Sequence, residues 1–361
     1  MTTQAIEPSF DLPSAEAFAE RLLSIINSGA LSLMISVGHR THLFDVLAGQ
    51  PAATSQQIAN AAGLNERYVR EWLNAMVVGR IVSYNPTDKT YELPDEHAAF
   101  LTQAASPNNM ATFAQYIPVL ASAEDQIIDC FYKGGGVPYS EFKRFHEVMA
   151  EDSGQTIVAA LEEHILPLIP DLQKRLQLGI DVLDVGCGSG RALNALAVLF
   201  PSSRFTGYDL SEEAIAAATA EAQRKCLTNV KFQVKDTTQL NEAEQYDWIT
   251  TFDAVHDQAR PDWVLQNIYR ALRRDGIYLM QDIHATTNVD GNLDHPVAPL
   301  LYTVSCMHCM TVSLAAGGLG LGTMWGQEKA LELLRAAGFS QIEIKQLPHD
   351  VMNDYYIIRK G

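Results

Sequence analysis

Hydrophobic and polar positions change their spacing along the chain and divide it into three parts. In the first part, residues 15–48 carry apolar side chains at helical spacing, and Lys, Arg, Asp and Glu are absent between Arg21 and Arg40. A helix that is apolar on nearly every side is expected to be buried, either against a second subunit or within its own domain. Its apolar positions include Leu22, Leu23, Ile26, Leu33, Val37 and Leu43.

Two short helices and a hairpin are predicted next. Thr54 can cap a helix that ends at Gly63, and Asn65 can cap a second helix with apolar positions as far as Met76. The stretches "RIVSY" and "TYEL" flank "NPTDK", which predicts a hairpin. Helix, turn, helix and hairpin together indicate a winged helix.

Winged helices often bind DNA, but the charges in this one argue against that function. From residue 43 to residue 101 the chain has four bases and seven acids, and the second helix pairs Glu66 and Glu71 with Arg67 and Arg70. DNA-binding modules normally carry a basic stripe on the docking face. We therefore expect the module to serve dimerisation or closure of a substrate site.

From Asp181 onward, short strands alternate with helices. The predicted strands are "DVLDV", "RFTGYD", "VKFQV", "YDWITTF", "GIYLMQD", "IEIKQL" and "YYIIR". This alternation predicts an α/β fold with a Rossmann-like, mostly parallel sheet of seven strands and a ligand at their carboxyl ends. We expect residues 1–102 to form a helical and winged-helix domain, 103–178 a helical connector and lid, and 179–361 the sheet domain.

Composition limits the possible binding partners of the protein and its cellular compartment. The net charge of −17 over 361 residues disfavours nucleic acid and anionic membranes as partners. Five scattered cysteines fit a reducing interior, and the N-terminus does not resemble a signal peptide, so we expect a cytoplasmic protein. Residues 295–327 are free of Lys, Arg, Asp and Glu and are long enough to cross a bilayer. Because two strands of one sheet flank this segment, we expect a buried helix or pocket lid instead.

The stretch "DVLDVGCGSG" joins the first strand to a helix, and its glycines indicate which cofactor the loop can bind. Gly186, Gly188 and Gly190 give the pattern G-x-G-x-G, and no lysine follows, which excludes a nucleotide P-loop. Arg191 stands where the dinucleotide fingerprint requires its third glycine, so we expect Gly190 to lie in the loop, away from helix packing. Asp209, at the end of the second strand, can accept hydrogen bonds from ribose hydroxyls, which by itself fits an adenine dinucleotide equally well.

Further acidic residues surround this loop. Asp184 precedes it, and Asp236 ends the third strand, where its side chain can accept the amino hydrogen of adenine. An acidic site suits a ligand with an ammonium and a sulfonium centre, and it suits a pyrophosphate poorly.

Taken together, the stretches "LDVGCGSG", "GYDLS", "VKDT", "YDWITTFDAVHD" and "LRRDGIYLMQD" resemble the class I S-adenosylmethionine-dependent methyltransferases. The N-terminal half is similar to winged-helix small-molecule O-methyltransferases that dimerise through that region. The resemblance implies S-adenosylmethionine as the cofactor, with Asp209 on the ribose, Asp236 and Thr237 beside the adenine, and Phe252 near the sulfonium. The full set of cofactor residues that it implies is Asp184, Gly186, Cys187, Gly188, Gly190, Asp209, Leu210, Asp236, Thr237, Phe252 and Asp253.

His256 is the candidate general base. In the O-methyltransferases that the chain resembles, a histidine followed by aspartate just past the fourth strand deprotonates the acceptor hydroxyl. Asp257 keeps this pair, although Gln258 replaces the tryptophan of the plant members. The alternatives are that His256 is structural and that Asp253 touches the substrate or the cofactor.

Two more segments are candidates for the substrate side. The single "CMHC" stretch supplies too few ligands for a structural zinc, so we expect a pocket-lining helix and no metal. His308 in that stretch can face the substrate or simply pack. Tyr139, in the loop "GGGVPYSEF", can close over the cofactor or substrate, or belong to an ordinary turn. A regular helix would place on one face Tyr302, Cys306, Cys309 and Ser313.

The sequence thus predicts methyl transfer from S-adenosylmethionine to a small, fairly apolar acceptor, preferably a hydroxyl, by a cytoplasmic homodimer. Three alternatives remain. One is a transcriptional regulator that binds the cofactor as a signal and DNA through the winged helix. The second is a nicotinamide dehydrogenase, which Arg191 disfavours. The third is a methyltransferase fold with other chemistry.

Overall fold

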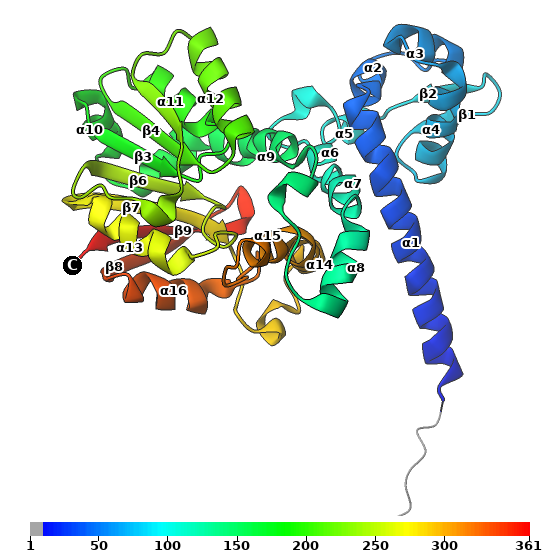
Figure 1. The fold of residues 1–361 in the computed structure, drawn as a ribbon. Helices are drawn as coiled ribbons and strands as arrows, with labels where there is room; N and C mark the ends of the chain where they lie inside the picture. The colour runs from blue at the N-terminus through cyan, green and yellow to red at the C-terminus, as the bar shows by residue number, and fades with distance from the viewer. Residues whose placement is uncertain (1–9) are drawn as a thin grey trace, which may run out of the picture. The chain divides into compact units, whose positions relative to one another are not determined.

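The computed structural model describes residues 10–361, which divide into two compact units (Figure 1). The first unit ends at Pro118, and the second comprises Val119–Gly361. The first begins with α1 (Leu12–Arg40) and α2 (Leu43–Leu47). The expectation of one helix over residues 15–48 is wrong near its C-terminal end, because His42 adopts a left-handed backbone with a φ of 59° and separates the two helices.

The winged-helix prediction is confirmed in the first unit. It contains α3 (Ser55–Ala62), α4 (Glu66–Val78), β1 (Ser83–Asn85) and the antiparallel β2 (Thr90–Glu92). Thr54 caps α3 in a capping box with Gln57, and the side chain of Asn65 accepts a hydrogen bond from the backbone amide of Arg67 in the first turn of α4. The unit continues through α5 (Asp95–Ala98), η1 (Gln103–Ala105) and α6 (Ala111–Ala114), and α7 (Tyr116–Ala121) runs across the boundary.

The first two thirds of α1 remain exposed in this chain. Leu22 is 45% exposed and Ile26 is 60% exposed, and the neighbouring apolar side chains behave in the same way. Its own unit therefore does not bury this stretch of the helix. The exposed large apolar residues of α1 are Leu12, Phe18, Leu22, Leu23, Ile25, Ile26, Leu33 and Val37.

The second unit opens with short helices, as predicted for the segment before the glycine loop. They are α8 (Glu124–Lys133), η2 (Tyr139–Glu141), α9 (Phe145–Ser153), the π-helical turns η3 (Gly154–Val158) and η4 (Leu161–Ile165), η5 (Leu166–Leu168) and α10 (Leu172–Leu178).

A sheet of seven strands follows, in the order β5-β4-β3-β6-β7-β9-β8. All seven predicted strands are present; β9 pairs antiparallel with both β7 and β8, and the other neighbouring strands pair in parallel. The chain leaves β3 toward β4 on one side and returns to β6 on the other, so a ligand crevice is expected at the carboxyl ends of these strands. The strands are β3 (Asp181–Val185), β4 (Arg204–Asp209), β5 (Val230–Val234), β6 (Tyr246–Phe252), β7 (Leu272–Ile283), β8 (Phe339–Leu347) and β9 (Asp350–Lys360).

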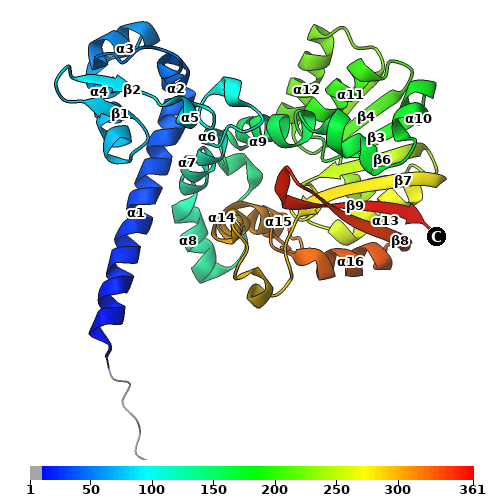
Figure 2. The same cartoon turned by 180° about the vertical axis from the view of Figure 1, so that it is seen from behind.

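Helices cover both faces of the sheet (Figures 1 and 2). Alternate strand residues point to opposite faces, so Val182 and Trp248 pack with α10 and α11 (Arg191–Leu199), where α12 (Glu212–Arg224) also lies. Leu183 and Ile249 pack with α13 (Pro261–Ala271) and α16 (Gly326–Ala336) on the other face. The expected Rossmann-like architecture is confirmed.

The charge-free segment forms one long helix between β7 and β8. After the short turn η7 (Val289–Asn292), α14 (Ala298–Val304) runs through a π-helical turn, η8 (Ser305–Cys309), into α15 (Met310–Ala315). By length and apolar composition, this helix and α1 could each cross a membrane. A span at residues 298–315 would separate β7 and β8, which belong to one sheet, so the expectation of a covering helix stands.

Candidate active site

The glycine loop between β3 and α11 adopts a conformation that other residues rarely take. Gly186, Gly188 and Gly190 have φ values of 75°, 51° and 67°. A Cβ on Gly186 would lie 2.5 Å from Ala254, and a Cβ on Gly190 would lie 2.5 Å from the ring of Phe232. Gly190 is the N-cap of α11, and a Cβ there would also lie 2.7 Å from Ala218 on α12, so the expectation that Gly190 lies away from helix packing is wrong. Around Gly188 there is open space, which is where a ligand can approach the backbone.

Asp209 fixes the edge of this loop. Its Oδ2 accepts a hydrogen bond from the backbone amide of Gly188 at 2.8 Å, and its Oδ1 accepts one from the amide of Ser211 at 2.8 Å. The remaining lone pairs of the carboxylate are free to accept from a diol. Leu210, which follows it, is exposed.

Asp236 and Thr237 follow β5, and the side chain of Asp236 makes only local hydrogen bonds among those described. Its Oδ1 caps η6 (Thr237–Gln239) by accepting from the backbone and hydroxyl of Thr238, and its Oδ2 accepts from Gln239. Thr237 is buried. The turn is thereby held rigid at the adenine end that the resemblance implies.

Asp184 lies below the loop, buried between two strands. The hydroxyl of Thr250 on β6 donates to its carboxylate at 2.8 Å. Burial raises the pKa of Asp184 to about 7, opposed by the Thr250 hydrogen bond and assisted by the charge of Asp209. Burial and the acids Asp184 and Asp209 also hold the pKa of the Cys187 thiol in the loop well above its usual value.

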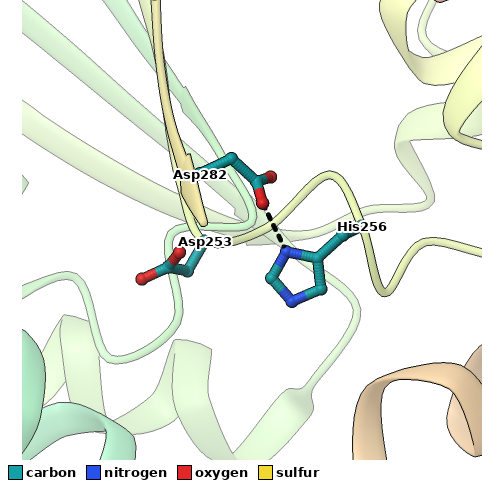
Figure 3. Close-up of side chains that lie close together, drawn as sticks. All are labelled: Asp253, His256 and Asp282. Carbon is teal, nitrogen blue, oxygen red and sulfur yellow. Dashed lines mark hydrogen bonds and ion pairs between the residues drawn. The ribbon is translucent and has the colours of Figure 1, made fainter. Parts of the chain in front are cut away.

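His256 and Asp282 form a buried pair at the carboxyl ends of β6 and β7. Figure 3 shows Nδ1 of His256 facing Oδ1 of Asp282, and the two atoms lie 2.8 Å apart. The same oxygen accepts hydrogen bonds from Trp325 Nε1 and from the backbone amide of Ile283, both at 2.9 Å. His256 is 3% exposed and Asp282 is 0% exposed. The imidazole is thus held with its second ring nitrogen directed away from Asp282.

The carboxylate that pairs with His256 lies far from it in the sequence. Asp257, which follows it in the chain, is not the carboxylate bonded to the imidazole; that role belongs to Asp282. Burial raises the pKa of Asp257 to about 6, opposed by the charge of His256 and assisted by the charges of Asp209 and Asp282. The position of Asp282 at the end of a predicted strand was a signal that could have identified it.

Opposing effects act on the His256 imidazole. Burial lowers the pKa of His256, whereas interactions with Asp282 and Cys309 raise it. The increase is larger than the decrease. The pKa of His256 therefore lies well above its usual value.

Asp253 follows β6 with a left-handed φ of 48°. Its Oδ2 accepts from Gln281 Nε2 at 3.3 Å, whereas its Oδ1 is buried and, among the described residues, has no hydrogen-bond partner. Burial and then the charge of Asp282 hold its pKa well above the usual value. Phe252, just before it, is half-buried against the core beneath α11.

Asp253, His256 and Asp282 could also be considered as a metal group, since their ligand atoms lie within 4.8 Å of one another. Two donors on one ion are separated by roughly 3.0–3.4 Å when metal–ligand bonds are near 2.1 Å. The 2.8 Å between Nδ1 and Oδ1 is instead a hydrogen-bond distance. We therefore assign a hydrogen bond between the imidazole and the carboxylate.

The two substrate-side candidates, Tyr139 and His308, come together. Their ring centroids lie 4.9 Å apart at 83°, and the His308 ring stacks on Phe145 with an interplanar angle of 5°. His308 is 1% exposed, burial lowers its pKa well below the usual value, and its Nε2 has no hydrogen-bond partner among the described residues. His146 stacks on the other side of Tyr139, at 4.6 Å.

The glycine-rich segment before Tyr139 docks on the charge-free helix. The backbone amide of Val137 donates to Thr311 Oγ1 at 2.8 Å, and a Cβ on Gly136 would lie 2.0 Å from the Thr311 carbonyl oxygen. The same helix contacts the loop of His256, since Ser313 Oγ donates to the carbonyl of Gln258 at 2.9 Å. The glycine-rich segment and the loop of His256 thus both contact the charge-free helix.

The π-helical turn changes the helix face expected from regular spacing. Cys309 and Ser313 are buried, but Tyr302 is exposed, because η8 inserts an extra residue into the helical repeat. The expectation of one face shared by Tyr302, Cys306, Cys309 and Ser313 is therefore wrong.

Comparisons with known proteins agree with this geometry. Residues 29–103 match the Rv2258c-like winged helix-turn-helix domain, and residues 176–338 match a methyltransferase domain. Human N-acetylserotonin methyltransferase, solved in complex with S-adenosylmethionine, has a similar fold with a TM-score of 0.68 at 18% identity, covering 99% of this chain and 100% of that one. Mitomycin 7-O-methyltransferase MmcR also has a similar fold, with a TM-score of 0.68 at 17% identity. The match covers 96% of this chain and 99% of that one.

A curated relative is similar in sequence over part of the chain. Malonyl-[acyl-carrier protein] O-methyltransferase of Bacillus cereus is 28% identical over 166 residues, which is 43% of this chain and 55% of that relative. The chain thus matches about half the length of this relative.

The two domain matches show an N-terminal winged-helix domain and a methyltransferase domain, and the fold is that of the class I S-adenosylmethionine-dependent methyltransferases. Members of this class use S-adenosylmethionine as the methyl donor.

Replacing the carboxylate of Asp282 should lower the pKa of His256. In Asp282→Asn the charge that favours the imidazolium is removed while burial remains, so the pKa should fall by about one unit or more. The fraction of neutral imidazole at neutral pH should rise accordingly. NMR titration of histidine labelled with nitrogen-15, with the His256 signal assigned from its loss in His256→Gln, measures the shift. An unchanged pKa would contradict the pairing.

Proposed function

We propose that this chain transfers the methyl group of S-adenosylmethionine to the hydroxyl of a small, fairly apolar acceptor, with His256 as the general base. The single observation that carries the proposal is the buried His256–Asp282 pair at the carboxyl edge of the sheet, beside the glycine loop. A hydroxyl is protonated at working pH and therefore requires a base, whereas an already neutral amine does not.

Different residues of the chain would bind different parts of the cofactor. When bound, S-adenosylmethionine supplies an electrophilic methyl group on a positive sulfur. Gly186, Gly188 and Gly190 would hold its methionine side, and Asp209 its ribose. Burial raises the pKa values of Asp184, Asp253 and Asp257 near the site, and a ligand with sulfonium and ammonium charges would favour the ionised forms of these carboxyl groups.

His256 would receive the acceptor proton on Nε2, because Nδ1 is held by Asp282. Asp282 fixes the orientation of the ring and stabilises the imidazolium that forms, as in other base–carboxylate pairs. Alignment of acceptor and donor would supply much of the remaining acceleration. Because the pKa of His256 is raised, the active neutral form becomes more abundant as the pH rises, so methyl transfer should increase on the alkaline side of neutrality.

The apolar character of the acceptor follows from the segments that meet above His256. Residues 295–327 contain no charged side chain of the Lys, Arg, Asp or Glu type, and the backbone amide of Gly322 donates to the carbonyl of His256 at 3.2 Å. The aromatic cluster around His308 adds the rings of Tyr139, Phe142 and Phe145. These groups favour binding of an apolar ligand over a charged one.

A homodimer in the cytoplasm completes the proposal. The apolar face of α1 is large for a free surface, and a second copy of the chain would bury it. All five cysteines are free, which fits a reducing compartment. Binding of DNA by the winged helix is disfavoured, because Arg67 and Arg70 on α4 already form ion pairs with Glu71 and Glu66.

Loss of the base should separate turnover from cofactor binding. In His256→Gln we expect methyl transfer to an acceptor, found by screening with labelled donor, to fall by about 100-fold or more while S-adenosylhomocysteine binds as in the wild type. His284→Gln is the matched control, since His284 forms a similar pair with Asp354 at 3.0 Å outside this site. Retained turnover in His256→Gln, measured alongside calorimetric binding, would refute the base assignment.

Removal of divalent cations should leave methyl transfer unchanged. The hydrogen-bonded assignment of His256 and Asp282 requires no ion, so activity after treatment with EDTA and desalting should equal that before. If activity were lost and then restored by a divalent cation, Asp253, His256 and Asp282 would have to be reinterpreted as its ligands.

Charge on the exposed face of α1 should dissociate the dimer. Leu22→Glu combined with Ile26→Glu places two carboxylates on the apolar face, where burial in an interface would be strongly unfavourable. Analytical ultracentrifugation should show a dimer for the wild type and a monomer for the double variant. Glu16→Gln, on the same helix, should stay dimeric. A monomeric wild type would exclude this interface.

A further inference from the structure

The amino-acid end of S-adenosylmethionine brings two opposite charges to the glycine loop. Its ammonium group suits the acids there, because Asp184 is buried below the loop and Asp209 accepts a hydrogen bond from the amide of Gly188. Its α-carboxylate does not, since like charges repel and a carboxylate that leaves water needs a cation or several hydrogen-bond donors. A positive group is therefore expected on the side of the loop that would hold the methionine.

Arg191 is the basic side chain nearest to this loop in the sequence. It follows Gly190, the N-cap of α11, and stands three positions after Gly188, around which there is open space. Arg191 is exposed, and within the described part of the chain its side chain forms no ion pair and no hydrogen bond. Lys235, the basic residue that follows β5, is instead paired with Glu242. The guanidinium of Arg191 is thus available to an anionic ligand.

Gly154 leaves room for this guanidinium. It is the first residue of the π-helical turn η3, which packs on α11. A Cβ on Gly154 would lie 2.9 Å from Nη1 of Arg191, which is closer than such contacts normally are. The φ of Gly154 is −60°, an ordinary helical value, so its backbone does not itself require glycine. The missing side chain therefore lets the guanidinium lie against the π-helical turn, next to the start of α11.

We propose that Arg191 binds the α-carboxylate of S-adenosylmethionine and that Gly154 sets the position of the guanidinium. A guanidinium can donate two parallel N–H groups to one carboxylate, which supplies both a compensating charge and a fixed geometry. Arg191 and the acids of the site would then recognise the two charges of the amino-acid end separately. The inference rests on the cofactor of the proposed function, and it uses neither His256 nor the acceptor.

Two ligands that differ only in the carboxylate test this role. They are S-adenosylhomocysteine and its decarboxylated analogue, S-adenosyl-3-thiopropylamine, each titrated calorimetrically into the full chain. We expect the wild type to bind S-adenosylhomocysteine about tenfold or more tightly than the analogue. In Arg191→Gln the affinity for S-adenosylhomocysteine should fall by about tenfold or more. The affinity of this variant for the analogue should not fall, because the analogue has no carboxylate for the guanidinium to bind.

Matched substitutions separate the guanidinium of Arg191 from charge in general. Arg204→Gln removes an exposed arginine at the first residue of β4, at the opposite end of the strand from Asp209, where it pairs with Asp181. Both affinities of Arg204→Gln should equal those of the wild type. Arg191→Lys keeps the charge and loses the planar fork, so its affinity for S-adenosylhomocysteine should lie between those of the wild type and Arg191→Gln.

Gly154→Ala tests how the guanidinium is positioned. Alanine suits the helical backbone at this residue, but its Cβ would displace the guanidinium. We expect Gly154→Ala to weaken binding of S-adenosylhomocysteine by about threefold or more and to leave the analogue unaffected. Added to Arg191→Gln, the same substitution should have no further effect, because the group that it displaces is absent. Equal losses in both backgrounds would contradict the role of Gly154.

Three results would overturn the role of Arg191. One is a wild type that binds the two ligands equally well. Another is an Arg191→Gln variant that binds S-adenosylhomocysteine as the wild type does. The third is an Arg191→Gln variant that loses affinity for both ligands to the same extent, which would indicate a structural effect. Retained binding of the analogue establishes that the variant is folded.

The proposal and the proposed function fail separately. Binding of S-adenosylhomocysteine that does not depend on Arg191 would remove the carboxylate assignment and leave the cofactor and the base in place. Conversely, binding that depends on Arg191, together with methyl transfer that does not depend on His256, would support the carboxylate assignment and remove the base. A wild type that binds neither ligand would overturn both.

Discussion

One carboxylate oxygen, Oδ1 of Asp282, accepts hydrogen bonds from His256, Trp325 and the backbone of Ile283 in a site with no exposure to solvent. Burying a carboxylate is costly unless such donors compensate for the lost water. The three donors come from the end of β7, from the loop after β6 and from the segment before α16. The interaction therefore fixes the candidate base and, at the same time, ties the charge-free segment to the edge of the sheet.

The cofactor side depends on a different constraint, which is backbone geometry. The loop from Gly186 to Gly190 packs against Ala254 and Phe232 at its two ends and stays open at Gly188, while Asp209 holds its shape by accepting the Gly188 amide. The acids beneath and beside the loop bias the site toward a positively charged ligand. The fold, the acidic residues near the glycine loop and the aromatic cluster around His308 therefore all favour methyl transfer from S-adenosylmethionine to an apolar acceptor.

Local signals made much of the fold predictable. The caps at Thr54 and Asn65, the hairpin around "NPTDK" and all seven strands could be located from neighbouring residues alone. The break at His42 could not, because its left-handed backbone leaves no periodic trace. Pairing of His256 with Asp282 was missed because it joins residues 26 positions apart, whereas the adjacent Asp257 was conspicuous in the sequence. The π-helical turn at Ser305–Cys309 also gave no signal, and it decides that Cys309 and His308 are buried.

The most direct test of the account is calorimetric titration of the wild type and Asp209→Asn with S-adenosylhomocysteine and, for comparison, NADH. The account predicts that the wild type binds S-adenosylhomocysteine and not NADH, and that Asp209→Asn loses most of that affinity because the carboxylate no longer accepts from the ribose. Binding of NADH alone would contradict the assignment of the glycine loop, and with it the role of His256.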